Sequence, residues 1–159
     1  MNMKQYLEQS EKTERKFPNG TFIDRKMATH IVCVAEKLAT ICKDVDDIKR
    51  DLIYGKELQF SELLHAALGA VTEAEELFSA IINHIFYDAL LDAANIFEEI
   101  GDIMWYQAIM LRIFGQTFEE AGRCNIEKLS ARFPDKFSEE SALNRDLQAE
   151  RAILERHVA

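Results

Sequence analysis

The sequence predicts an all-α protein, a four-helix-type bundle with polar helical extensions at its N- and C-termini. Only 6 glycines and 2 prolines occur in 159 residues, so few positions interrupt regular structure. Hydrophobic residues make up 48% of the chain, enough for a sizeable core. Apolar side chains recur at alternating spacings of three and four, the period of an amphipathic helix. We expect one domain over residues 1–159, with a core at about 24–137 and a charged helix at about 138–158.

The first long helix is expected to begin after Asp24, whose side chain can cap it. The preceding residues 4–16 are polar and either helical or frayed, and 17–20 (Phe-Pro-Asn-Gly) give a turn signal. Gly55 can end the helix. Its apolar seam, expected to face other helices of a bundle, consists of Met27, Ile31, Val34, Leu38, Ile41, Val45, Ile48 and Leu52.

The second long helix is expected from about Ser61 to Phe86. Its seam, again in steps of four and three, consists of Phe60, Leu64, Ala67, Val71, Ala74, Phe78, Ile81 and Ile85. Glu73 lies at the edge of the expected buried face, among small and apolar neighbours, and Glu76 lies one step further out. A carboxylate bordered by small and apolar residues does not lie on a typical solvent-exposed face of a helix.

The third helix, expected over residues 88–114, is apolar on nearly every side and is therefore predicted to be central. At about 100° per residue, one narrow polar stripe runs along it. The stripe consists of Asp92, Asn95, Glu99, Asp102 and Tyr106. Burying carboxylates without a partner costs several kcal/mol, so the stripe indicates a site that binds something.

Residues 115–116 (Gly-Gln) end this helix, and a shorter one follows that stops at Pro134. Thr117 and Glu120 form a capping-box pattern at its start. It carries Asn125, Lys128 and Arg132. The last predicted helix, at 138–158, has a thin apolar stripe of Leu143, Leu147 and Leu154.

Charge and composition exclude several classes of function. The formal net charge of −9 argues against a nucleic-acid polymer or an anionic membrane as the main partner. No apolar run approaches the roughly 20 residues that span a bilayer. The N-terminal residues lack the apolar core of a signal peptide. Three cysteines without a metal-type pair favour reduced thiols in a cytoplasmic protein.

The chemistry is expected at two acidic pairs, Glu73 with Glu76 and Glu99 with Asp102. Residues three apart share one face of a helix, so two facing helices would gather four carboxylates. Oxygen ligands without Cys or His favour Mg²⁺, with Mn²⁺ as a substitute. Because Mg²⁺ fills its coordination shell with water and phosphate oxygens, the substrate is predicted to be a phosphorylated small molecule.

Three blocks of sequence resemble the MazG-like all-α nucleoside triphosphate pyrophosphohydrolases. Residues 72–77 (TEAEEL) and 97–103 (FEEIGDI) resemble the E-E-x-x-E and E-x-x-D segments of that superfamily. Residues 125–134 (NIEKLSARFP) resemble its N-x-x-K-L-x-x-R-[FY]-P segment, and the likeness covers about 60–137. The resemblance implies hydrolysis between the α and β phosphates of a (d)NTP or related nucleotide, giving a monophosphate and pyrophosphate.

The resemblance also implies roles for individual residues. The metal-binding and catalytic acids would be Glu73, Glu76, Glu99 and Asp102. Lys128 and Arg132 would reach phosphate oxygens, and Asn125 would hydrogen-bond the substrate. Tyr106, on the polar stripe, is a candidate for contact with the nucleotide. The chain departs from the pattern at Thr72, where the first Glu of E-E-x-x-E usually stands, and this leaves the number of ions open.

Two other functions are compatible with the residues alone. The regular seam of the first helix also suits a non-catalytic helical assembly module. A carboxylate-bridged redox enzyme is disfavoured, because the E-x-x-H at Glu62–His65 has no second copy. Under any of these functions the apolar third helix needs covering, so we expect a homodimer or homotetramer.

Overall fold

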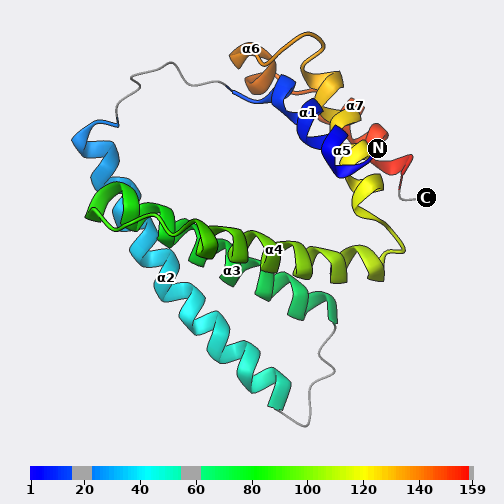
Figure 1. Cartoon of the computed structure of the whole chain (residues 1–159). Helices are drawn as coiled ribbons and strands as arrows, with labels where there is room; N and C mark the ends of the chain where they lie inside the picture. The colour runs from blue at the N-terminus through cyan, green and yellow to red at the C-terminus, as the bar shows by residue number, and fades with distance from the viewer. Residues whose placement is uncertain (16–22, 55–61, 158–159) are drawn as a thin grey trace. The chain divides into compact units, whose positions relative to one another are not determined.

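The protein is all-α, as the sequence predicts. The structure, a computed structural model, describes residues 1–15, 23–54 and 62–157, with no side-chain description for 51–54. Within these ranges it contains helices and no strand (Figure 1). The helices are α1 (Met3–Thr13), α2 (Arg25–Tyr54), α3 (Glu62–Tyr87), α4 (Ala93–Ile113), α5 (Phe118–Arg132), α6 (Glu139–Leu143) and α7 (Leu147–Glu155). The predicted turn at 17–20, Gly55 and the seam residue Phe60 lie outside the described residues.

The chain divides into two compact units. The α2–α4 unit comprises Phe22–Phe114, and the terminal unit comprises Met1–Thr21 together with Gly115–Ala159. The predicted core at about 24–137 therefore includes residues of both units. That the whole chain acts as one domain stays a prediction.

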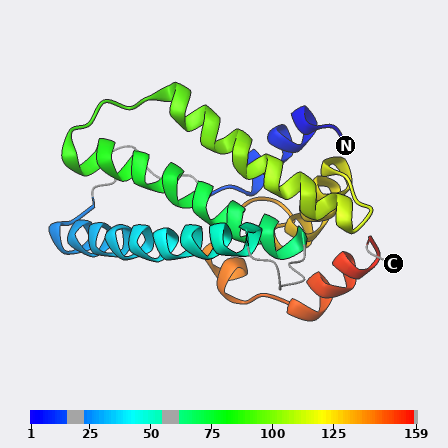
Figure 2. The same cartoon turned by 90° about the horizontal axis from the view of Figure 1, so that it is seen from below.

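In the α2–α4 unit, α3 packs against both α2 and α4 (Figures 1 and 2). Asp24 caps α2 as predicted, because its carboxylate accepts a hydrogen bond from the Met27 amide at 2.8 Å. The predicted start of the third helix at residue 88 is wrong. Asp88 adopts a left-handed backbone (φ 53°), and α4 starts only after Asp92, whose side chain accepts from the amides of Ala94 and Asn95.

The helices of this unit meet through small residues, and this corrects the predicted buried seams. The small residues that are buried include Ala35 and Cys42 on α2 and Ala66, Gly69 and Thr72 on α3. Cys42 and Thr72 lie where these two helices meet, and Gly69 lies against Tyr106 of α4. Many large residues of the predicted seams are exposed instead. They are Met27, Val34, Ile41 and Ile48 on α2 and Leu64, Val71, Ile81 and Ile85 on α3. Small side chains let two helices approach closely, whereas the seven-residue rows of large side chains face away from this contact.

The prediction that the third helix is central also fails within the single chain. Phe97 is 79% exposed, and Trp105 is exposed as well. The side chains that α4 buries are Glu99 and Ile109. Part of the polar stripe thus faces the neighbouring helix while much of the apolar surface of α4 faces outward.

In the terminal unit, α5 packs against α1 and α7. The predicted capping box of α5 is confirmed, with Thr117 and Glu120 exchanging hydrogen bonds. The single C-terminal helix predicted over 138–158 is replaced by α6 and α7. The backbone at Asn144 leaves the helical region, and the Asp146 side chain caps the new start at α7.

A buried ionic cluster ties α5 to α7 in the terminal unit. Glu150, 5% exposed, accepts two hydrogen bonds from Arg132 at 2.8 and 2.6 Å and two from Arg145 at 3.3 and 2.7 Å. Hydrogen bonds from the two guanidinium groups lower the pKa of Glu150 to about 2. The carboxylate is therefore ionised at neutral pH and is held by two cations.

Candidate metal centre

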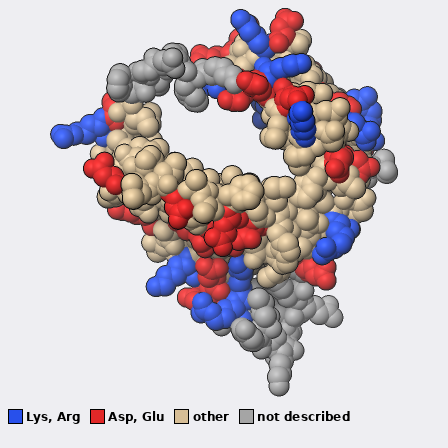
Figure 3. All heavy atoms as spheres, viewed as in Figure 1, with Lys and Arg blue, Asp and Glu red and all other residues tan. Residues whose placement is uncertain are grey.

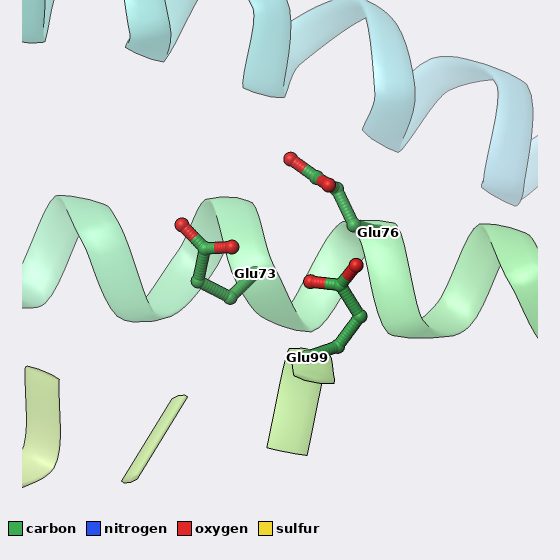
Figure 4. Close-up of side chains that lie close together, drawn as sticks. All are labelled: Glu73, Glu76 and Glu99. Atoms are coloured by element: carbon green, nitrogen blue, oxygen red, sulfur yellow. The ribbon is translucent and has the colours of Figure 1, made fainter. Parts of the chain in front are cut away.

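Three of the predicted carboxylates gather at one place in the α2–α4 unit. Glu73 and Glu76 project from α3, one turn apart, and Glu99 projects from α4 (Figure 4). One ligand oxygen from each lies within 4.8 Å of the others. Two oxygens bound to one Mg²⁺ at about 2.1 Å can be at most about 4.2 Å apart, so small side-chain rotations bring these three to a shared ion. The donor set is all oxygen, which fits Mg²⁺ or Mn²⁺.

Glu99 is the most deeply placed of the three. It is 4% exposed, and its Oε1 accepts a hydrogen bond of 2.6 Å from the Asn95 side-chain amide, one turn earlier on α4. This bond fixes the orientation of the carboxylate, as partners of metal ligands commonly do. Of the polar stripe predicted on the third helix, Glu99 is buried and Asn95 is half-buried, whereas Asp92 and Asp102 are exposed.

Asp102 and Tyr106 are placed differently from one another. Asp102 is exposed on α4 and is not part of the three-carboxylate group, although its charge helps to raise the pKa of Glu73. Tyr106 is half-buried, and its ring lies edge-on to His65 and to Trp105. The structure thus brings together three of the four predicted acids.

The electrostatics of the group indicate a need for positive charge. Burial, then the Glu76 carboxylate, and further the Asp102 and Glu99 carboxylates raise the pKa of Glu73 above its ordinary value. Partial loss of water and the Glu99, Glu75 and Asp46 carboxylates raise the pKa of Glu76. Figure 3 shows acidic side chains gathered on this unit. Ionised carboxylates this close together favour either protons or a cation.

One cation already lies beside the group, and the sequence reasoning missed it. Lys49 of α2 is 12% exposed at its side chain, and its Nζ lies 3.3 Å from the Thr72 hydroxyl. Its charge opposes the rise in pKa of both Glu73 and Glu76. Lys49 follows Ala35 and Cys42 at seven-residue spacing, so it continues the row that α2 buries against α3. This seven-residue spacing was the feature of the sequence that could have identified Lys49.

Gly69 and Tyr106 pack so closely that only glycine fits at position 69. A Cβ added to Gly69 would overlap the Tyr106 ring, whereas one added to Gly101 on α4 would meet no atom within 4 Å. Gly69 is buried one turn before Glu73, so this contact sets how near α4 comes to α3 at the carboxylates.

Gly69→Ala is expected to destabilise the protein by about 1–3 kcal/mol, because the Tyr106 ring must move from its packed position. The matched variant Gly101→Ala adds the same methyl group to an exposed helical position, and it is expected to stabilise by about 0.5–1 kcal/mol. Urea unfolding of both variants checks this. Equal effects of the two substitutions would contradict the close Gly69–Tyr106 contact.

Metal-free protein is expected to lose stability as pH rises above about 4.5. The folded-state pKa values of Glu73 and Glu76 are raised from 4.5, so their stabilising protons are fully present below that value and are lost as pH passes through the raised values. Glu150, with a lowered pKa, acts in a separate window below 4.5. Melting temperatures in chelator across this range should fall less steeply for Glu73→Gln. Parallel curves for wild type and variant would contradict the prediction.

The predicted substrate residues of α5 belong to the terminal unit. Asn125 donates a hydrogen bond from its amide to the Tyr6 hydroxyl at 3.1 Å. Lys128 is half-buried on the same helix. Arg132 is committed to Glu150, and this pair competes with the predicted phosphate contact.

Comparison with known proteins supports the resemblance seen in the sequence. Residues 62–137 match the family model described as the MazG nucleotide pyrophosphohydrolase domain. The match begins at the start of α3 and extends past the end of α5, so it contains the carboxylates and Lys128. Neither curated proteins nor solved structures gave a match. No helix among the described residues is long and apolar enough to cross a membrane.

Proposed function

We propose, on the premise that residues 62–137 belong to the MazG-like superfamily, that this protein is a Mg²⁺-dependent nucleotide pyrophosphohydrolase. It cleaves a nucleoside triphosphate or a related nucleotide between the α and β phosphates and releases a monophosphate and pyrophosphate. The observation that carries the proposal is the meeting of Glu73, Glu76 and Glu99, with Glu99 buried and held by Asn95. Placing the buried Glu99 beside two further carboxylates costs free energy that a bound cation would offset.

The residues of the chain have distinct tasks in this reaction. Glu73, Glu76 and Glu99 hold the divalent ion and fix its position. A bound Mg²⁺ would polarise phosphoryl oxygens and lower the pKa of a coordinated water. Asn95 keeps Glu99 oriented between turnovers. Asp102, exposed one turn beyond Glu99, is proposed to orient the attacking water or to complete the ligand set.

Positive charge for the phosphates must come from basic side chains as well as from the ion, since the chain carries a net charge of −9. Lys128 is proposed to contact phosphate oxygens, and Asn125 to hydrogen-bond the nucleotide. Arg132 already donates two bonds to Glu150, so we assign it to holding α7 against α5. Tyr106 is proposed to contact the nucleotide from the α4 side.

Product analysis tests the proposed function directly. The purified protein is incubated with each (d)NTP with Mg²⁺, with Mn²⁺ and with chelator, and the products are separated. Monophosphate and pyrophosphate in equal amounts, dependent on metal, are expected for at least one nucleotide. Release of orthophosphate, or no turnover with any nucleotide, would overturn the proposal.

We also propose that a second copy of the chain covers the exposed apolar rows of α2 and α3. Met27, Val34, Ile41 and Ile48 recur every seven residues, and Leu64, Val71 and Ile85 follow the same seven-residue register with the half-buried Phe78 between the last two. Rows at heptad spacing are the surface that another helix packs against, and the two rows lie on adjacent helices. A helical pair facing its own copy would make a four-helix interface and a homodimer or homotetramer.

Ile41→Glu is expected to reduce the molar mass measured by light scattering from that of an oligomer to that of a monomer. A charge placed in the centre of the row makes its burial costly. Ala39→Glu, exposed on the same helix and off the row, is the control and should leave the mass unchanged. A monomeric wild-type protein would contradict the proposed interface. An oligomer that gains no stability from Mg²⁺ would favour a non-catalytic assembly module instead.

A further inference from the structure

The side chain of Lys49 reaches from α2 into the contact between α3 and α4. Its ammonium lies 3.3 Å from the Thr72 hydroxyl, 5.4 Å from the centre of the Tyr106 ring and 3.5 Å from Asp46 Oδ1. A lysine this little exposed gives up much of its hydration, so its position needs compensating partners. These three partners come from the three helices of the unit, and each attracts a positive charge.

Thr72 is arranged to receive this ammonium. Its side chain is 2% exposed, and its single hydroxyl proton has two acceptors within reach. The Gly69 carbonyl lies at 2.9 Å and Glu73 Oε1 at 3.4 Å, so the hydroxyl donates to the carbonyl. The oxygen lone pairs then remain to accept from Lys49. A neutral hydroxyl with a cation beside it thus stands next to the three carboxylates.

We propose that Lys49 is a fixed cation of the metal centre, which takes the place of a second divalent ion. The three gathered carboxylates carry three negative charges, which one divalent ion together with one ammonium balances. Asp46 and Asp102 add further negative charge nearby, but both are solvent-exposed enough for water to screen them. A fourth acid at position 72 without the lysine would call for two divalent ions. The inference rests on the proposed function, and it assigns to this chain a single metal ion held by Glu73, Glu76 and Glu99.

Lys49 acts through its position and its charge. Its removal should therefore change metal affinity in the opposite direction from the removal of a metal ligand. In the absence of metal its ammonium relieves the repulsion among the carboxylates, so it stabilises the fold. In the presence of metal it repels the ion across the same group. Removing it should weaken the metal-free protein and tighten metal binding, a combination that loss of packing alone does not produce.

The test counts bound Mn²⁺ by electron paramagnetic resonance and measures its affinity in wild type, Lys49→Met and Lys49→Arg. One ion per chain is expected in wild type. Lys49→Met should bind Mn²⁺ about tenfold more tightly, because a like charge is removed from the site. Its melting temperature in chelator should be below that of wild type, and the rise on adding metal should be larger. Lys49→Arg, which keeps the charge, should bind Mn²⁺ within threefold of wild type.

Two further variants make the result decisive. Lys43→Met removes an exposed lysine from the same helix and should change neither metal affinity nor the metal-free melting temperature. The double variant Lys49→Met with Thr72→Glu should bind a second Mn²⁺, visible as spin coupling between paired ions. Two ions in wild type, or equal affinity changes in Lys49→Met and Lys49→Arg, would overturn the inference. Metal counting needs no substrate, so its failure is distinct from an absence of nucleotide turnover, which would overturn the proposed function.

Discussion

Glu76→Gln is expected to lower nucleotide turnover by about 10³-fold while the helical circular-dichroism signal stays unchanged. Glutamine keeps the shape of the side chain but removes the charge that holds the ion, and stabilisation of developing charge by such groups is worth this much. Glu76 is exposed, so its replacement leaves no buried gap. The variant should also be more stable than wild type in chelator, since one of the mutually repelling carboxylates is gone. Steady-state rates at saturating metal and melting curves in chelator measure both effects.

Glu75→Gln is the control for this substitution. Glu75 is adjacent in sequence but accepts a hydrogen bond from Ser79 on its own helix, and it is not one of the three gathered carboxylates. Its turnover should stay within threefold of wild type. Similar losses in both variants, or loss of helical signal in Glu76→Gln, would assign the acidic segment a structural role.

Glu150→Gln is expected to have the largest effect on stability, a loss of about 3–5 kcal/mol. The carboxylate accepts four hydrogen bonds from Arg132 and Arg145, and its removal leaves two guanidinium groups without their shared anion. The loss should shrink as pH falls. The lowered pKa of Glu150 contributes stability above the ordinary value of 4.5, and this contribution disappears as pH approaches about 2. Urea unfolding at several pH values measures it.

Glu155→Gln serves as the matched comparison on the same helix. Glu155 accepts from Arg151 one turn earlier, but both side chains are exposed, so the change should cost less than about 0.5 kcal/mol. If the two variants are equally stable, the buried cluster does not hold α7 to α5. If the turnover of Glu150→Gln falls only as far as its fraction of folded protein falls, the effect of the substitution is purely structural.

The helices and their caps could be predicted because their signals are local. Asp24, Thr117 and Glu120 act on amides within three residues, so the sequence alone reveals them. The start of α4 was missed by about five residues, since Asp88 to Asp92 carry apolar neighbours that continue the helical period. Nothing in the period records that Asp88 takes a left-handed backbone.

Which face of each helix is buried could not be predicted, because apolar rows look alike whether they pack within the chain or against another molecule. Large side chains mark the faces that need covering, and the structure shows that α2 and α3 meet at small residues such as Cys42 and Thr72 instead. The acidic pairs could be predicted from the sequence because their spacing places each pair on one face of a helix. The position of Lys49 could not be predicted, since its contact with Thr72 depends on how two helices pair.

The alkylation rate of the buried Cys42 thiol reports how often α2 and α3 separate. Its Sγ lies 4.0 Å from the Val71 carbonyl oxygen, and burial together with Glu75 and Asp46 raises the pKa of the thiol. A thiol-alkylating reagent can reach it only when the two helices part, so the alkylation rate counts their openings. Cys33 lies half-buried on the same helix, so it should react without such an opening, and its alkylation rate serves as an internal reference. Any ligand that stabilises the α2–α4 unit should lower the alkylation rate of Cys42 and leave that of Cys33 unchanged.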